Sequence, residues 1–267
     1  MAVDTTPLLT RRTSLLAKVE TTTGTAITLA STDGAFNVYN ISYAPNIAIE
    51  ERLDQASWGL LASVHGTRFA TLDFEADLVG KGSSGVAAWA SLLLPACGLT
   101  QSSGIFTTGY AASQSTLTIG MYVDGVKLAI SGAAGSVRFP LRTGFPCRAA
   151  FSFLGKIEAD ADVALVTPDA FTTKPPRFAG NTATFASFAP KCSTLEIAVN
   201  NTLTMREDPA DATGARSCVI TDQRIVVTVD PEMNLVATRD WYTLLTGHTE
   251  ESMSIAVGTA ANNIMTF

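Results

Sequence analysis

Charged residues are scarce in this chain of 267 residues. They make up 16% of the sequence, whereas soluble domains usually contain about 25%. Because hydrophobic residues make up 46%, we expect much of the surface to be covered by other subunits. The net charge of −6 argues against tight binding to nucleic-acid phosphates, which requires clustered lysine and arginine. It is compatible with a surface past which nucleic acid moves without sticking.

Motifs for metal binding, redox chemistry and catalysis are also missing. The four cysteines form no CxxC pair, and we interpret them as small buried hydrophobic residues with free thiols. His65 and His248 stand in no metal-ligand spacing, and the chain has no G-x-S-x-G nucleophile elbow. No apolar run approaches a membrane span, and Met1–Arg12 lacks the apolar core of a secretory signal. The sequence thus predicts no cofactor, no metal, no catalytic site and no membrane insertion, in a protein made in a reducing cytoplasm.

One glycine-rich loop imitates a nucleotide site. Gly80–Gly85 reads G-x-G-x-x-G after a predicted strand and before a predicted helix. The strand before it has an acidic face, whereas a Rossmann strand is buried on both faces. No carboxylate lies between Asp77 and Asp124 to bind a ribose. We therefore interpret this segment as a loop leading into a helix, and the acidic run Glu158–Asp162 as a solvated strand face.

Alternating apolar and polar residues predict a mainly β chain. The clearest run is Thr71–Val79, in which successive side chains point to opposite faces. The predicted core face holds Leu72, Phe74, Ala76 and Leu78, and the opposite, acidic face holds Asp73, Glu75 and Asp77. Asp124-Gly125 predicts a tight hairpin turn.

The second half of the chain repeats the order of the first. Each half has a strand pair with a charged turn, a basic residue opening an alternating strand, a short helix with one tryptophan, and a further strand. The helices are predicted at Val86–Ala96 with Trp89 and at Asp240–Thr246 with Trp241, and each tryptophan is expected to anchor its helix to a sheet. Loops of unequal length explain why the spacing between matching residues drifts.

This repeat and a proline-rich connection predict the domain organisation. Thr167–Pro176 ends in Lys-Pro-Pro and is the expected linker. The polar segment Met1–Ala17 is expected to be a loose arm or to reach a neighbouring subunit. The predicted parts are an N-terminal arm and first strand (1–35), a first β domain (36–166), a linker (167–180) and a second, shorter β domain (181–267).

Four stretches follow the patterns of one known family. Lys18–Thr25 is similar to a K-x-E-x-x-x-G-T start, and Gly66–Gly82 to a strand and loop written G…F…(acidic)…L-x-G-x-G. Asp124–Val137 resembles hairpins of the form DG…GA.G.V, and Phe151–Lys156 resembles F-x-F-x-G-K. In these patterns the chain resembles the tail tube proteins of long-tailed, siphovirus-like bacteriophages. The resemblance covers most of the chain.

The resemblance implies a fold and a function. The fold is mainly β, with two tandem tail-tube-like β-sandwich or half-barrel units, each with a short side helix. Subunits would pair edge to edge into rings of three doubled or six single chains. The rings would stack, through loops and N-terminal arms, into a hollow tube that carries genomic DNA into the host cell. The implied protein is a structural component of the virion tail, without enzyme activity, assembled in the host cytoplasm with tape-measure, tail-tip and terminator proteins.

Two sets of residues are candidates for this assembly. An acidic lumen would repel DNA phosphates, and its candidates are Asp73, Glu75, Asp77 and, in the second half, Glu232. The candidate subunit contacts are Arg11, Arg12, Glu50, Glu51, Arg52, Asp54, Arg206, Glu207 and Asp208. The acidic row could instead face solvent or a neighbour. Alternative functions are a tail terminator, head–tail adaptor or capsid decoration protein and, less favoured, a carbohydrate-binding β-sandwich.

Overall fold

The computed structural model describes residues 9–34, 36–81, 85–108, 114–168, 173–186 and 188–267. Strands dominate it, which confirms the prediction of a mainly β chain. The strands are β1 (Thr13–Val19), β2 (Val38–Leu53), β3 (Leu60–Asp77), β4 (Leu99–Ser102), β5 (Ile105–Thr108), β6 (Leu117–Val123), β7 (Val126–Arg142), β8 (Arg148–Ile157), β9 (Ala161–Asp162), β10 (Ala183–Phe185), β11 (Cys192–Glu207), β12 (Ala215–Pro231), β13 (Met253–Val257) and β14 (Met265–Thr266). The helical elements are η1 (Ser31–Gly34), α1 (Ala88–Leu93), η2 (Pro95–Cys97) and α2 (Trp241–Thr246).

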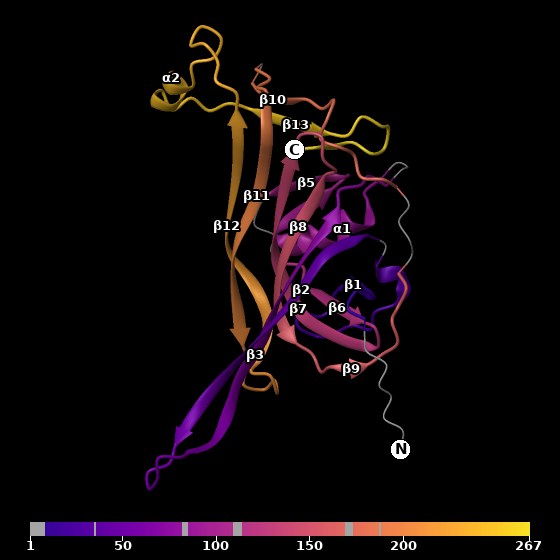
Figure 1. Ribbon diagram of the computed structural model, residues 1–267, viewed down its shortest axis with the longest axis vertical. Helices are drawn as coiled ribbons and strands as arrows, with labels where there is room; N and C mark the ends of the chain where they lie inside the picture. Colours follow the sequence, from indigo (N-terminus) through magenta and orange to yellow (C-terminus); the bar gives the residue numbers. More distant parts are fainter. Residues whose placement is uncertain (1–8, 35, 82–84, 109–113, 169–172, 187) are drawn as a thin grey trace.

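Nine of the described strands form one large antiparallel sheet (Figure 1). Its main path runs β1–β6–β7–β8–β3–β2. The long strand β7 also pairs with β9 and, through residues 137–142, with β11, which in turn pairs with β12. Two small sheets, β10–β13–β14 and β4–β5, complete the described fold. Strands from both halves of the chain therefore share one sheet.

The order of elements in the second half follows that in the first. The hairpin β2–β3 precedes α1 and β6, and the hairpin β11–β12 precedes α2 and β13. The turns of both long hairpins lie toward the same end of the molecule (Figure 1). The shared sheet means that the two halves contact each other along paired strands. The division at residues 167–180 stays a prediction.

The hydrophobic core lies on one face of the large sheet, where α1 covers it. Phe74, Phe151 and Phe153 stack there, with ring centroids 5.4–5.9 Å apart. Trp89 of α1 meets Phe151 edge-on and is 1% exposed. Its indole Nε1 donates a hydrogen bond to the carbonyl oxygen of Val79 at 2.8 Å. The predicted core residues of the clearest strand are all buried: Leu72, Phe74, Ala76 and Leu78.

The second tryptophan does not anchor its helix in a core. No residue of α2 is buried; the ring of Trp241 lies edge to face with Phe185 and Phe188, and the guanidinium of Arg239 lies 4.8 Å from its centroid. The helix lies beyond the end of the large sheet (Figure 1), so no broad apolar face is available beneath it. Trp89 therefore anchors its helix in the core as predicted, whereas Trp241 is only half-buried and packs against Phe185 of the small sheet instead of in a core.

Two boundaries also differ from the predictions. The predicted helix 86–96 is a short α-helix followed by a 3₁₀ turn that Pro95 opens. The predicted loose arm ends at Arg12, because β1 begins at Thr13 and buries Leu15 and Leu16. Residues 1–8 of that arm lie outside the described residues. Among the helices that the structure describes, none is both long and apolar enough to cross a membrane.

Candidate assembly surfaces

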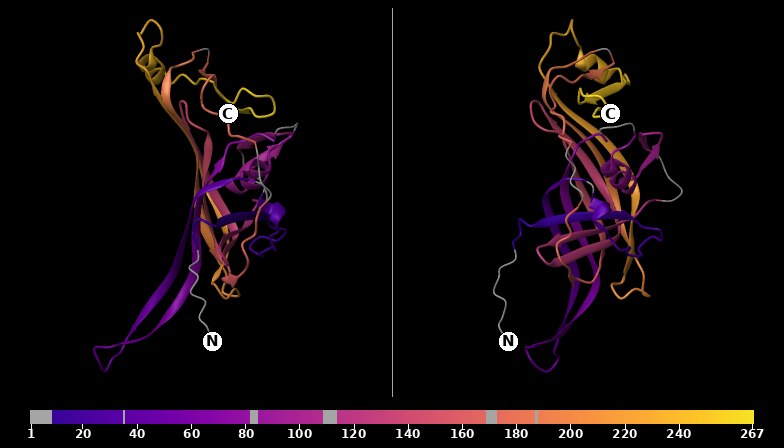
Figure 2. Two further views of the ribbon diagram at one scale, coloured as in Figure 1. Left: turned by 45° about the vertical axis from the view of Figure 1, so that its right-hand side comes forward. Right: turned by 90° about the vertical axis from the view of Figure 1, so that its right-hand side faces the viewer.

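The outer end of the hairpin β2–β3 is exposed along almost its whole length. We call residues 46–68 the projecting hairpin, because β8 no longer pairs with β3 beyond Phe69. Figure 2 shows it leaving the body of the protein. Its exposed apolar residues are Ile47, Ile49, Leu53, Trp58, Leu60, Leu61 and Val64. Trp58, in the turn, is fully exposed, and so much apolar surface on one projection is typical of a protein–protein contact.

Four of the predicted contact residues lie on this hairpin. Glu50, Glu51 and Arg52 are exposed near its end. Asp54 instead shapes the turn, since its carboxylate accepts hydrogen bonds from the Ala56 amide at 3.0 Å and from a serine hydroxyl. The Ala56 hydrogen bond is the main reason that the pKa of Asp54 is lowered. Three of these charges are therefore available to a neighbouring molecule, and Asp54 is engaged within its own turn.

The acidic row on β3 is largely paired within the chain. Glu75 forms an ion pair with Arg148 at 3.2 Å. Asp77 is 4% exposed and accepts a hydrogen bond from the Tyr39 hydroxyl at 2.9 Å, and Arg148 Nε lies 3.7 Å from its other oxygen. The Arg148 guanidinium also stacks on the Tyr39 ring at 3.9 Å. Asp73 is half-buried. Asp77 is therefore not a free surface charge, and Glu75 is partly neutralised.

Glu232 does not extend this row. It directly follows β12 and is exposed, and β12 pairs only with β11 among the described strands. On the face of the sheet that carries Asp73, the strand register places Arg138 of β7 in line with Glu75, with Ala150 of β8 between them. The exposed Arg138 gives this face charges of both signs. The structure thus shows a mixed surface where the sequence predicted an acidic one.

The start of the described chain is fixed to a hairpin turn. Arg12 forms an ion pair with Asp124 at 2.5 Å, and the amide of Leu9 donates to the same carboxylate. Asp124 lies in the predicted turn between β6 and β7 and has a positive φ of 38°. Arg11 is exposed. Of the two predicted arginine contacts, Arg11 is free to meet another molecule, while Arg12 is engaged within the chain.

The remaining predicted contacts lie at the end of the hairpin β11–β12. Arg206 and Glu207 are exposed on β11. Asp208 opens the turn to β12 and accepts a hydrogen bond from the amide of Ala210 at 2.9 Å. The same turn contacts the base of the projecting hairpin, where the amide of Arg68 donates to the Thr213 carbonyl oxygen at 3.0 Å. These residues therefore lie close to where the projecting hairpin leaves the body.

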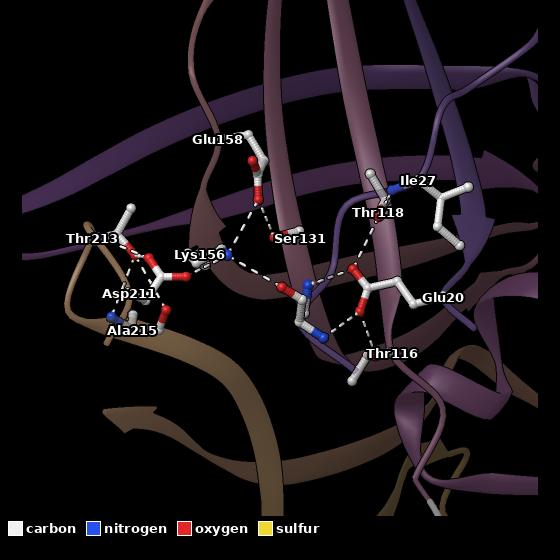
Figure 3. Close-up of polar contacts among 12 residues, drawn as sticks. Glu20, Ile27, Thr116, Thr118, Ser131, Lys156, Glu158, Asp211, Thr213 and Ala215 are labelled. Carbon is white, nitrogen blue, oxygen red and sulfur yellow. Dashed lines mark hydrogen bonds and ion pairs between the residues drawn. The ribbon is translucent and has the colours of Figure 1, made fainter. Parts of the chain in front are cut away.

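A buried lysine connects this turn to the rest of the protein (Figure 3). Lys156 is 8% exposed and its Nζ lies 2.9 Å from Asp211, 3.2 Å from the Gly24 carbonyl oxygen and 3.6 Å from Glu158. Burial lowers the pKa of Lys156, but its contacts with Asp211 and Glu158 outweigh that effect and raise it overall. Hydrogen bonds from Thr213, with a smaller contribution from Lys156, lower the pKa of Asp211 to about 2. Lys156 and Asp211 are therefore both held ionised at neutral pH.

A third carboxylate, Glu20, belongs to this polar cluster. Glu20 accepts hydrogen bonds from the amides of Gly24 and Gly132 and from the hydroxyls of Thr116 and Thr118, at 2.7–2.9 Å. It thereby joins the segment after β1 to β6 and β7 (Figure 3). Sequence reasoning did not single out Glu20 or Lys156. Their only signal was a place within the family-like stretches at Lys18–Thr25 and Phe151–Lys156.

The described residues form few other candidate sites. Within the ranges that the structure describes, no three His, Cys, Asp or Glu side chains come close enough to hold a metal ion. Burial raises the pKa of the Cys147 and Cys218 thiols to about 11, which fits cysteines that act as small apolar residues. Residues 82–84 of the glycine-rich loop lie outside the described residues.

Two long edges of the large sheet are open to a further strand. β2 and β12 are border strands of 16 and 17 residues, each paired on one side only within the described chain. Unpaired edges of this length invite pairing with another chain unless they are covered. Together with the projecting hairpin, they define a class: a mainly β structural subunit built for assembly.

A comparison with known protein families identifies the family within this class. The family described as phage tail tube protein matches residues 10–267, so the chain belongs to this family. It is a structural tail tube protein of a phage virion. No curated protein matches the sequence.

Proposed function

We propose that this protein polymerises as stacked rings into the hollow tail tube, and that genomic DNA passes through the tube into the host cell. One observation carries the proposal: the same subunit has two long sheet edges without a partner strand and one exposed apolar projection. Edges supply a lateral contact and the projection supplies an axial one. A head-to-tail contact that closes by rotation gives rings, and a second contact that repeats gives a filament.

The lateral contact is formed by β2 of one subunit and β12 of the next. Closing a sheet around an axis removes the exposed edges that would otherwise aggregate. Three doubled chains or six single chains per ring both fit. The recurring order of hairpin, helix and strand supports counting two units per chain, whereas the single shared sheet supports counting one.

The axial contact is formed by the projecting hairpin. Trp58 and the neighbouring Leu53 and Leu60 have no cover within the subunit. Burying them against the adjacent ring would remove this apolar surface from water. The exposed charges Glu50, Glu51 and Arg52 would then lie at the rim of that contact.

The lumen is lined by the face of the large sheet that carries Asp73. Arg148 pairs with both Glu75 and Asp77 and so offsets one of their two negative charges. The strand register places the exposed Arg138 and Arg142 of β7 on this face as well, so its charges are of both signs. DNA would therefore slide past a mixed, sparsely charged wall. Tape-measure, tail-tip and terminator proteins are the expected partners, with assembly in the host cytoplasm.

Electron microscopy of the purified protein at high concentration tests this function. We expect hollow tubes or stacked rings, and end-on views that show threefold or sixfold symmetry and so give the number of chains per ring. Lone rings that never stack would favour a tail terminator. Discrete monomers under all conditions, including with added tail-tip protein, would contradict the tube and favour an adaptor, decoration or binding protein.

A further inference from the structure

The base of the projecting hairpin rests on a loop from the second half of the chain. The last pair between β3 and β8 is Phe69 with Lys156. At Arg68, one residue closer to the tip of the hairpin, β3 bonds to the turn between β11 and β12 instead of to β8. The amide of Arg68 donates to the Thr213 carbonyl oxygen at 3.0 Å, and its Nη2 donates to the Ala212 carbonyl oxygen at 3.1 Å.

The turn is itself held by the buried lysine. Asp211 accepts from the Thr213 amide at 2.9 Å and from the Thr213 hydroxyl at 2.6 Å, and it contacts Lys156 at 2.9 Å. A continuous series of contacts thus runs from Arg68 through Thr213 and Asp211 to Lys156. Gly24 closes the cluster, because its carbonyl oxygen also binds the lysine.

We propose that the turn between β11 and β12 is a brace that sets the direction of the projecting hairpin, with Lys156 and Asp211 as its positioning residues. The inference rests on the proposed axial role of the hairpin. Beyond Arg68 the hairpin has only two strands, and a two-stranded hairpin alone is marginally stable in water. The nine residues of β3 from Leu60 to Arg68 span roughly 27 Å, so a tilt of about 10° at the base would move the tip by about 5 Å.

A pair of matched variants tests the brace. Asp208 and Asp211 lie in the same turn, and each accepts an amide hydrogen bond from the residue two positions on, at 2.9 Å. Only Asp211 also contacts Lys156. Asp211→Asn therefore removes the charge that holds the brace, and Asp208→Asn is its control. Lys156→Met removes the other partner and should reproduce the effect of Asp211→Asn.

Amide hydrogen exchange in dilute, unassembled subunits measures the brace directly. We expect the Arg68 amide to exchange about tenfold faster in Asp211→Asn, because a charge-assisted contact supports its acceptor, and to be unchanged in Asp208→Asn. Under assembly conditions Asp211→Asn should give fewer and shorter tubes than the control.

Three outcomes would overturn the brace. They are unchanged Arg68 exchange in Asp211→Asn, equal acceleration in Asp208→Asn, and a loosened hairpin with tubes of normal length. The exchange measurement needs no tubes. If the unmodified protein failed to polymerise, the proposed function would fail, while the exchange rates would still decide whether the turn supports the hairpin.

Discussion

Trp89 and Trp58 are the same residue type in opposite surroundings. Trp89 is 1% exposed beneath α1, and Trp58 is fully exposed in the turn of the projecting hairpin. Replacing each by alanine separates folding from assembly, because one tryptophan contributes to the core and the other has little to lose within the subunit. We expect Trp89→Ala to destabilise the subunit and Trp58→Ala to impair polymerisation alone.

The magnitudes follow from the contacts. Trp89→Ala removes the edge contact with Phe151 and the hydrogen bond to Val79, and large-to-small changes of this kind cost about 3–5 kcal/mol. Trp58→Ala should change the free energy of unfolding by less than about 0.5 kcal/mol. If the ring of Trp58 buries about 200 Å² in the tube, the loss per axial contact reaches at most about 5 kcal/mol.

Urea unfolding of dilute subunits measures the first quantity, and sedimentation with electron microscopy measures tube length. Trp89→Phe serves as a milder variant if the alanine variant does not fold, and it should cost about 1 kcal/mol through the lost indole donor. The reasoning is refuted if Trp58→Ala destabilises the subunit by more than about 1 kcal/mol, or if it polymerises normally.

Three further predictions concern stability. Gly24 and Gly144 both have positive φ, but a Cβ added at Gly24 meets a backbone oxygen of β12 at 2.2 Å and one at Gly144 meets nothing within 4 Å. Denaturant unfolding should show a cost of about 1–2 kcal/mol for Gly144→Ala and about 2–4 kcal/mol for Gly24→Ala; equal costs would contradict the close approach. The pKa of Asp211 is lowered from 3.8 to about 2, so its contribution is complete above pH 4 and is lost as the pH falls toward 2. Asp211→Asn should weaken that acid dependence, and an unaltered pH profile would exclude this carboxylate and its hydrogen bonds from Thr213 as the source. Asp73→Lys should leave the melting temperature nearly unchanged, whereas Asp77→Lys, beside a paired arginine, should cost about 3 kcal/mol or more; the reverse order would refute the burial argument.

Local patterns predicted the local structure well. The alternation in Thr71–Val79 gave the correct core face, because a strand with one buried face must repeat every two residues. The spacing around Trp89 gave a helix that does cover the core. The same spacing around Trp241 gave a helix without a core, since the pattern of a helix does not reveal what lies beneath it.

Long-range pairing could not be read from the sequence. Arg148 lies 73 residues from Glu75, and nothing near either residue indicates that the two meet. Lys156 and Asp211 are 55 residues apart and were assigned to different predicted domains. Whether a carboxylate on a strand is free or paired depends on which strand lies beside it. For that reason the acidic face was predicted correctly as a row of residues but not as a row of free charges.

Strand β7 pairs with strands from both halves of the chain, and this has a consequence for the chain during its synthesis. Residues 137–142 of β7 complete their pairing only with residues 194–199 of β11, and Val137 meets Val199, 62 positions later. At about 5–20 residues per second, a ribosome needs about 3–12 s to make that segment. During this interval Phe139 and Leu141, buried in the finished protein, border an open strand edge. A chain stopped before β11 would keep that edge and is expected to aggregate, so the first half of this protein is complete only once the second has been translated.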